Sequence, residues 1–169
     1  MKLKARQRNL LIDILVITAL LVAVIIVYVG AQLWLATDTP FIVIASGSMS
    51  PALEVGDIII VQKVSSTNIQ VGEIIVFDSP EEIRTIHRVT QIQPLPNGTI
   101  QFKTKGDANP SEETYWTSEE DVHGRVLYKI PYLGWMALIP TIPITIAVII
   151  IIITLIWPEK QRKRRKHRH

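Results

Sequence analysis

The chain has 169 residues, no cysteine and a formal net charge of +3, and 48% of its residues are hydrophobic. That length suggests one domain, with or without appended segments. Without cysteine the chain has no disulfide framework, no cysteine nucleophile and no cysteine-bound zinc. Its hydrophobic residues are concentrated in two uncharged runs, residues 14–37 and 130–158. Because about 20 apolar residues cross a bilayer core, a freely soluble single domain is excluded.

The first apolar run predicts a transmembrane helix over residues 10–37, preceded by a basic N-terminus over residues 1–9. A cleaved signal peptide is the alternative, since basic residues precede the run. The apolar region of a signal peptide is only about 7–15 residues long. This run is longer and no small-residue cleavage site follows it, so we expect an uncleaved anchor.

Residues 38–130 predict a small β domain, because short β-branched runs alternate there with turn residues. A hairpin turn is expected at residues 94–98, and the polar, acidic stretch at residues 109–121 is expected to be a loop. The expected strands are Phe41–Ala45, Asp57–Gln62, Glu73–Phe77, Arg84–Gln93, Thr99–Lys105 and Val122–Tyr128.

The second apolar run predicts a transmembrane helix over residues 135–157, followed by a basic tail over residues 158–169. Pro140 and Pro143 fall near its start, where a kink is expected. The β-branched residues that follow would favour a strand in water. In lipid each segment must close its own backbone hydrogen bonds, so we expect a helix.

Charge predicts how the chain is oriented. Residues 38–129 carry seven Lys/Arg against thirteen Asp/Glu, whereas both termini are strongly basic. Because basic flanks stay on the cytoplasmic side, both termini are expected inside and the β domain outside. Nucleic-acid binding is the other function of a basic tail. Directly after a membrane span, contact with anionic lipid is the better interpretation, and we expect no nucleic-acid partner.

Three short stretches in the β domain carry side chains suited to catalysis. Ser46 and Ser48 flank a glycine at the end of an apolar strand, where a turn can present a hydroxyl. His87 lies in an alternating strand, and an imidazole accepts a proton at neutral pH. Asp107 follows a glycine at a strand end, where a carboxylate can orient an imidazole. Each stretch alone is typical of an ordinary turn or strand.

Together these stretches resemble the ordered motifs of type I signal peptidases. The motifs are Ser-Gly-Ser-Met-x-Pro from Ser46, Gly56-Asp57, His87-Arg-Val and Lys105-Gly-Asp-x-Asn. Bacterial members usually carry a lysine where this chain has His-Arg-Val, so it is similar to the archaeal and endoplasmic-reticulum branch. The resemblance spans about residues 41–126. It implies a mainly β fold, with a small signal-peptidase-like β domain flanked by an N-terminal and a C-terminal transmembrane helix.

The resemblance also implies residue roles. Ser48 would be the nucleophile and His87 the general base, with Ser46 and the Ser48 N–H as the oxyanion hole. Asp107 matches the Gly-Asp carboxylate of the family. Relatives tend to carry a second aspartate about six positions later, where this chain has Glu113. The orienting carboxylate is therefore left open between Asp107, Glu113 and the neighbouring Glu112.

The predicted function is a membrane-bound serine endopeptidase that removes signal peptides from secretory preproteins. We expect no cofactor and no metal site, since the remaining histidines beyond His87 and His123 lie in the tail across the membrane. Expected partners are preproteins, lipid, and a translocon or partner subunits. The expected location is the plasma membrane, or the endoplasmic reticulum membrane in a eukaryote. The alternatives are a non-catalytic β module or subunit of a processing complex, and a self-cleaving regulatory peptidase.

Overall fold

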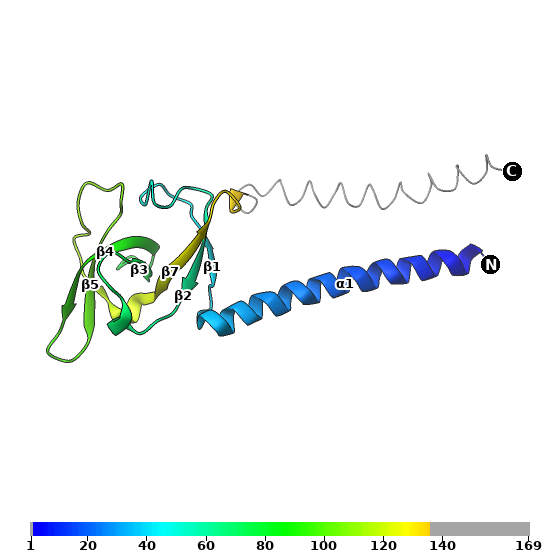
Figure 1. Cartoon of the computed structure of the whole chain (residues 1–169), viewed down its shortest axis with the longest axis horizontal. Helices are drawn as coiled ribbons and strands as arrows, with labels where there is room; N and C mark the ends of the chain where they lie inside the picture. Colours follow the sequence, from blue (N-terminus) through cyan, green and yellow to red (C-terminus); the bar gives the residue numbers. More distant parts are fainter. Residues whose placement is uncertain (1, 136–169) are drawn as a thin grey trace.

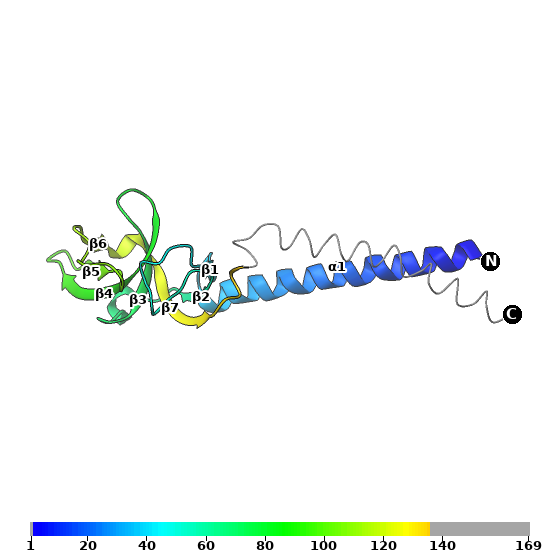
Figure 2. The same cartoon turned by 90° about the horizontal axis from the view of Figure 1, so that it is seen from above.

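The computed structural model describes residues 2–135, and side chains from residue 11 onward. Within these residues one long helix, α1 (Lys2–Leu35), runs away from a small β domain (Figures 1 and 2). The predicted second transmembrane helix, apart from Trp135, and the predicted basic tail lie outside the described residues.

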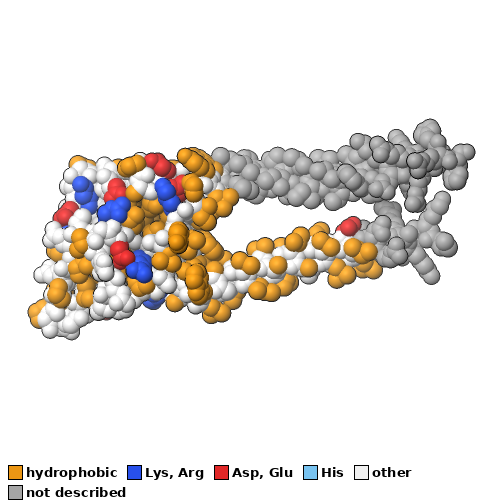
Figure 3. Space-filling model, in the orientation of Figure 1, with side chains coloured by type: hydrophobic (Ala, Val, Ile, Leu, Met, Phe, Trp, Pro, Cys, Tyr) orange, Lys and Arg blue, Asp and Glu red, His pale blue; other side chains and the backbone are white. Residues whose placement is uncertain are grey.

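Helix α1 confirms the first predicted helix but begins earlier than expected. The basic residues after Met1, predicted as a separate N-terminus, belong to the same helix. Its segment Leu11–Leu35 is long and apolar enough to cross a membrane, and no residue of its apolar 18-residue window is buried against the rest of the chain. Apolar side chains cover its surface, while the charged side chains gather on the β domain (Figure 3).

The C-terminal end of α1 is fixed to the sheet. Leu35 is buried at 2% exposure, and its carbonyl accepts a hydrogen bond from the Lys63 N–H at 2.9 Å. The Gln32 side chain also donates to the Asp38 carbonyl at 2.8 Å. The direction of the helix is therefore tied to the β domain, which places that domain directly at the end of the apolar span.

The β domain is one curved antiparallel sheet, which confirms the predicted mainly β class. The strand order is β1-β2-β7-β3-β4-β5-β6. The strands are β1 (Phe41–Val43), β2 (Ile58–Gln62), β3 (Ile74–Asp78), β4 (Arg84–Pro94), β5 (Ile100–Lys105), β6 (Thr117–Ser118) and β7 (Val122–Ile130). Register shifts interrupt three of the strand pairs. Such irregularities bend strands, so the sheet curls into a half-barrel.

Two hydrophobic clusters pack against opposite faces of the sheet. One contains Met49 and Val76, and the other contains Ile75 and Phe77. Strand β3 thus contributes to both clusters, which explains why its sequence is continuously apolar rather than alternating. Strand β4, which carries His87, pairs with the buried β3. This pairing fixes the backbone position of His87.

The connections confirm the predicted hairpin and correct the predicted loop. Strands β4 and β5 are joined by a turn in which the Leu95 N–H donates to the Thr99 carbonyl, with Gly98 at φ +88°. The stretch at residues 109–121, expected to be a loop throughout, also contains β6 and a short 3-10 helix, Glu119–Asp121. A two-residue strand has too few residues to show alternation, so the pattern could not reveal it.

Candidate active site

The segment that carries Ser48 is a loop closed at its base. The Ile44 N–H donates to the Asp57 carbonyl at 2.8 Å, and the Gly56 N–H donates to the Ile44 carbonyl at 2.9 Å. Within the loop, Met49 is buried at 2% exposure. Ser48 precedes this buried anchor and is half-buried. Burial of the methionine therefore fixes the turn while the serine stays at the surface.

The loop also depends on the buried carboxylate of Asp57, whose structural role the sequence did not show. Its oxygens accept hydrogen bonds from the Glu54 N–H at 3.0 Å and the Tyr132 N–H at 3.2 Å. Lys129 Nζ lies 3.6 Å away. Burial by itself would raise the pKa of Asp57, but the two N–H donors and Lys129 outweigh it and lower that pKa. The carboxylate is thus held ionised where it joins the loop to the end of β7.

We expect Asp57→Asn to lower the free energy of unfolding by about 1–3 kcal/mol, because an amide nitrogen would face a backbone N–H donor. Thermal unfolding of the full chain in detergent micelles measures this change. The exposed Asp38→Asn is the matched control. Since the pKa of Asp57 is lowered by folding, its contribution should be present near pH 7 and fade as the pH falls through that pKa. Equal stability of both variants would contradict this role.

The two serine hydroxyls predicted to act together lie near each other. Ser46 Oγ and Ser48 Oγ are 3.4 Å apart, and Ser46 is exposed. Among the side chains of residues 11–135, the Ser48 hydroxyl forms a hydrogen bond with Ser46 and none with His87. A Cβ added to Gly47 would meet no atom within 4 Å. The space over the turn is therefore open to a substrate.

The turn after β5 packs directly on Ser48. The Ala108 N–H donates to the Ser48 carbonyl at 2.9 Å. A Cβ on Gly106 would lie 2.7 Å from that same carbonyl oxygen. Only glycine allows this approach, which gives a physical reason for the glycine of the Lys-Gly-Asp stretch. The predicted nucleophile and the predicted carboxylate turn are thus in contact.

His87 lies in the middle of β4, opposite Ile75, and is buried at 5% exposure. Its ring meets Phe77 edge-on, with centroids 6.3 Å apart. Nδ1 is 2.9 Å from Glu113 Oε1, although the N–H is not aligned to form a regular hydrogen bond. Burial lowers the pKa of His87 more than the negative charges of Glu113 and Asp107 raise it. The imidazole is therefore neutral at pH 7, as a general base must be.

The three carboxylates that the sequence left open have different partners. Asp107 forms a two-point ion pair with Arg88, at 2.9 and 2.6 Å, and this pair raises the pKa of Arg88. Glu112 accepts from the Gln91 side chain at 3.3 Å. Glu113 contacts His87, and its N–H donates to the Thr104 carbonyl at 2.9 Å. Of the three, Glu113 is therefore the carboxylate placed against the ring.

The second histidine of the domain lies in a different cluster. His123 Nε2 is 2.7 Å from Asp78 Oδ2, and the same carboxylate pairs with Arg84 at 3.0 Å. Among the described residues, no group of three or more His, Cys, Asp or Glu side chains is arranged to hold a metal ion.

Comparison with known proteins identifies the family. A sequence model described as signal peptidase, peptidase S26, matches residues 12–108. The human signal peptidase complex catalytic subunit SEC11C is 31% identical over 144 residues, covering 80% of this chain and 75% of the relative. The human putative subunit SEC11B is 33% identical over 118 residues, which cover 65% and 70%. The catalytic subunit sec11 of Dictyostelium discoideum is 28% identical, covering 68% of each chain.

The curved β sheet with its hydroxyl, imidazole and carboxylate groups thus belongs to a peptidase, a hydrolase of peptide bonds. The chain belongs to the signal peptidase, peptidase S26 family, in the branch of archaeal and endoplasmic-reticulum enzymes. This confirms the family predicted from the ordered motifs.

Proposed function

We propose that the chain is a membrane-anchored serine endopeptidase that cleaves N-terminal signal peptides from secretory preproteins. Ser48 is the nucleophile, His87 the general base and Glu113 the group that orients the imidazole. The observation that carries this assignment is the 2.9 Å contact between the buried His87 ring and Glu113, beside the turn that binds the Ser48 carbonyl.

The proposed reaction has two steps. His87 takes the Ser48 proton as the hydroxyl oxygen attacks the scissile carbonyl, and the Ser46 hydroxyl and Ser48 N–H donate to the developing oxyanion. The protonated ring then gives its proton to the leaving amine, which frees the mature chain. Water, deprotonated by the same ring, attacks the ester and releases the signal peptide. No cofactor is needed for these steps.

In this proposal Glu113 and Asp107 have different roles. Near Nδ1, Glu113 holds the ring so that Nε2 is free to accept a proton, and its charge stabilises the imidazolium that forms. Asp107 pairs with Arg88 and so holds the turn that contacts Ser48. Relatives tend to carry an aspartate where this chain has Glu113. The carboxylate of this longer side chain still contacts the ring, 2.9 Å from His87 Nδ1.

Both termini are proposed to lie in the cytoplasm, with the β domain on the outer side of the membrane. The apolar segment Leu11–Leu35 is preceded by basic residues, and the β domain is acidic. The relatives are named as catalytic subunits of a signal peptidase complex, so partner subunits are proposed here too. The membrane is the plasma membrane, or the endoplasmic reticulum membrane in a eukaryotic cell.

The test is cleavage of a preprotein by the full chain in proteoliposomes. Wild type is compared with Ser48→Ala and with Ser50→Ala, a matched serine whose hydroxyl instead donates to Glu54 at 2.8 Å. We expect cleavage by wild type and Ser50→Ala, and none by Ser48→Ala. Equal results from all three would favour a non-catalytic β module. A cut confined to this chain itself would indicate a self-cleaving peptidase.

The pH dependence of kcat/KM provides a second test. Activity should fall as the pH drops through the pKa of His87, because the imidazolium cannot act as a base. Since burial lowers this pKa, the midpoint of the acid limb should lie below the ordinary value of 6.5. Glu113→Gln removes a charge that raises the pKa, so the residual activity should show a still lower midpoint. A midpoint above 6.5 in the wild type would contradict the neutral buried base.

A further inference from the structure

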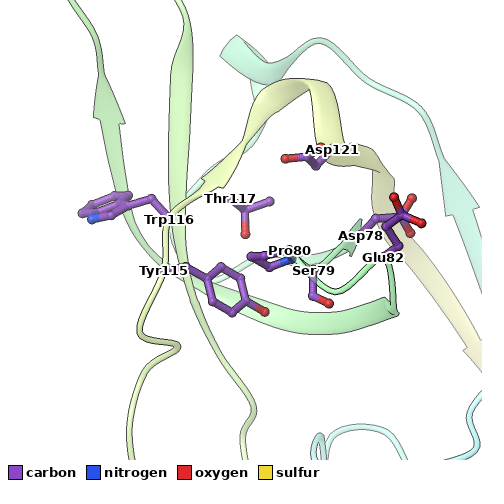
Figure 4. Close-up of a pocket in the computed structure, with 8 residues that line it drawn as sticks. All are labelled: Asp78, Ser79, Pro80, Glu82, Tyr115, Trp116, Thr117 and Asp121. Carbon is purple, nitrogen blue, oxygen red and sulfur yellow. The ribbon is translucent and has the colours of Figure 1, made fainter.

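A cavity of about 650 Å³ lies outside the proposed catalytic cluster of Ser48, His87 and Glu113 (Figure 4). It opens between the connection from β3 to β4, residues 79–83, and the segment that leads into β6. Three carboxylates line it, namely Asp78, Glu82 and Asp121.

The charge of this cavity is negative. Asp78 pairs with Arg84 and His123, whereas within residues 2–135 neither Glu82 nor Asp121 forms an ion pair. On the aromatic side, Lys103 Nζ lies 5.5 Å from the centre of the Trp116 ring and donates to the Tyr115 carbonyl at 3.3 Å. Lys103 does not line the cavity, and the Trp116 ring beside it points away from the Tyr115 ring and the Thr117 hydroxyl (Figure 4).

A buried hydroxyl without a partner points into the same space. Thr117 is 3% exposed, and its Oγ1 has no hydrogen-bond partner. In Figure 4 this hydroxyl is directed toward the space between Tyr115 and Pro80. A buried oxygen left unpaired is unfavourable, so a ligand that donates a hydrogen bond here would be favoured.

The chemistry of the lining selects an organic cation. The carboxylates that line the cavity attract positive charge. The Thr117 hydroxyl oxygen can accept a hydrogen bond from an N–H donor. The Tyr115 ring provides an apolar wall against which a cation can stack. An ammonium or guanidinium group at the end of an apolar stem matches all three features.

The cavity is also close to the catalytic cluster. Tyr115 is only two residues from Glu113, whose carboxylate lies 2.9 Å from His87. An extended residue spans at most about 3.6 Å, so the two α-carbons are at most about 7 Å apart. The cavity is thus within reach of a side chain a few residues from the cut in a polypeptide bound at His87.

We propose that this cavity binds a lysine or arginine side chain of the preprotein, a few residues from the cleaved bond. The proposal rests on the proposed function and adds a specificity site to it. Glu82 and Asp121 would attract the cation, and Thr117 would accept a hydrogen bond from it.

The test scans one preprotein with an otherwise uncharged region around the cut. Lysine, glutamine or glutamate is placed at each of six positions on either side, and kcat/KM is measured with the full chain in proteoliposomes. At one position we expect lysine to exceed glutamine by about fivefold, as for an ion pair near a surface. The preprotein with glutamate at that position should be cleaved more slowly than the one with glutamine. No preference at any position would overturn the proposal.

Variants then assign the preference to this cavity. In the double variant Glu82→Gln, Asp121→Asn, the lysine-to-glutamine ratio should fall to about one. The matched control is Glu120→Gln, an exposed acid beside Asp121 that does not line the cavity, and it should keep the wild-type ratio. Thr117→Val should lower the ratio and Thr117→Ser should retain it. A ratio unchanged in the double variant would overturn the proposal.

Binding without turnover separates this proposal from the catalytic one. The Ser48→Ala full chain is titrated by calorimetry with the lysine and glutamine versions of the preprotein. Tighter binding of the lysine version, lost when Glu82→Gln and Asp121→Asn are added, supports the cavity even where cleavage has failed. Equal binding of the lysine and glutamine versions would overturn the cavity proposal, whether or not Ser48 is the nucleophile.

Discussion

Ser48→Ala, His87→Ala and the double variant are each expected to lower kcat by about the same factor, on the order of 10⁶. The reason is that the hydroxyl and the ring act as one unit. Without the base the hydroxyl remains a weak nucleophile, and without the hydroxyl the base has no proton to take. Single-turnover cleavage of a preprotein in proteoliposomes measures the three rates.

Two results would contradict this account of the pair. If kcat of the double variant fell by the product of the two single-variant factors, the two side chains would act independently. A loss of only a few-fold in His87→Ala would mean that another group takes the proton. Because His87 is buried, His87→Gln, which keeps a polar side chain of similar length, and thermal unfolding of each variant distinguish lost catalysis from lost folding.

Glu113→Gln is expected to lower kcat by roughly 10⁴, as removal of the orienting carboxylate does in a catalytic triad. The amide has the size of the carboxylate but no charge to stabilise the imidazolium, and its NH₂ group can select the wrong tautomer of the ring. Glu113→Asp should retain part of the activity if the loop adjusts. Rates and pH profiles in proteoliposomes measure both effects.

The neighbouring carboxylates serve as matched controls. Glu112→Gln should change kcat by no more than a few-fold, because Glu112 contacts Gln91 rather than the ring. Asp107→Asn should mainly reduce stability, because it leaves the Arg88 guanidinium without its anion. Full activity in Glu113→Gln, together with a 10⁴-fold loss in Asp107→Asn at unchanged stability, would assign the orienting role to Asp107 instead.

Much of the fold could be predicted because its signals are local. The uncharged length of residues 14–37 predicted the helix, and β-branched runs bounded by turn residues predicted six of the seven strands. The two-residue β6 was missed because its pairing with β5 is decided by tertiary contacts. The structural role of Asp57 was also missed, since it depends on a residue 75 positions away, Tyr132.

The carboxylate that lies against His87 could not be selected from the sequence for a physical reason. Asp107, Glu112 and Glu113 lie within one short segment after β5, so spacing alone allows each to reach His87. The selection depends on a competing partner, because Arg88 binds Asp107 at two points and leaves the ring to Glu113. Such competition between neighbouring ion pairs appears only once β4 and β5 are in register.

The most direct test of the central claim is to find the acyl group formed during turnover. The full chain is mixed with a preprotein in proteoliposomes, quenched in acid within one turnover, and digested for mass spectrometry. The proposed mechanism predicts that the carboxyl end of the signal peptide is esterified to Ser48, and that this adduct is absent in His87→Ala. An adduct on Ser46 or Ser50 in place of Ser48 would contradict it.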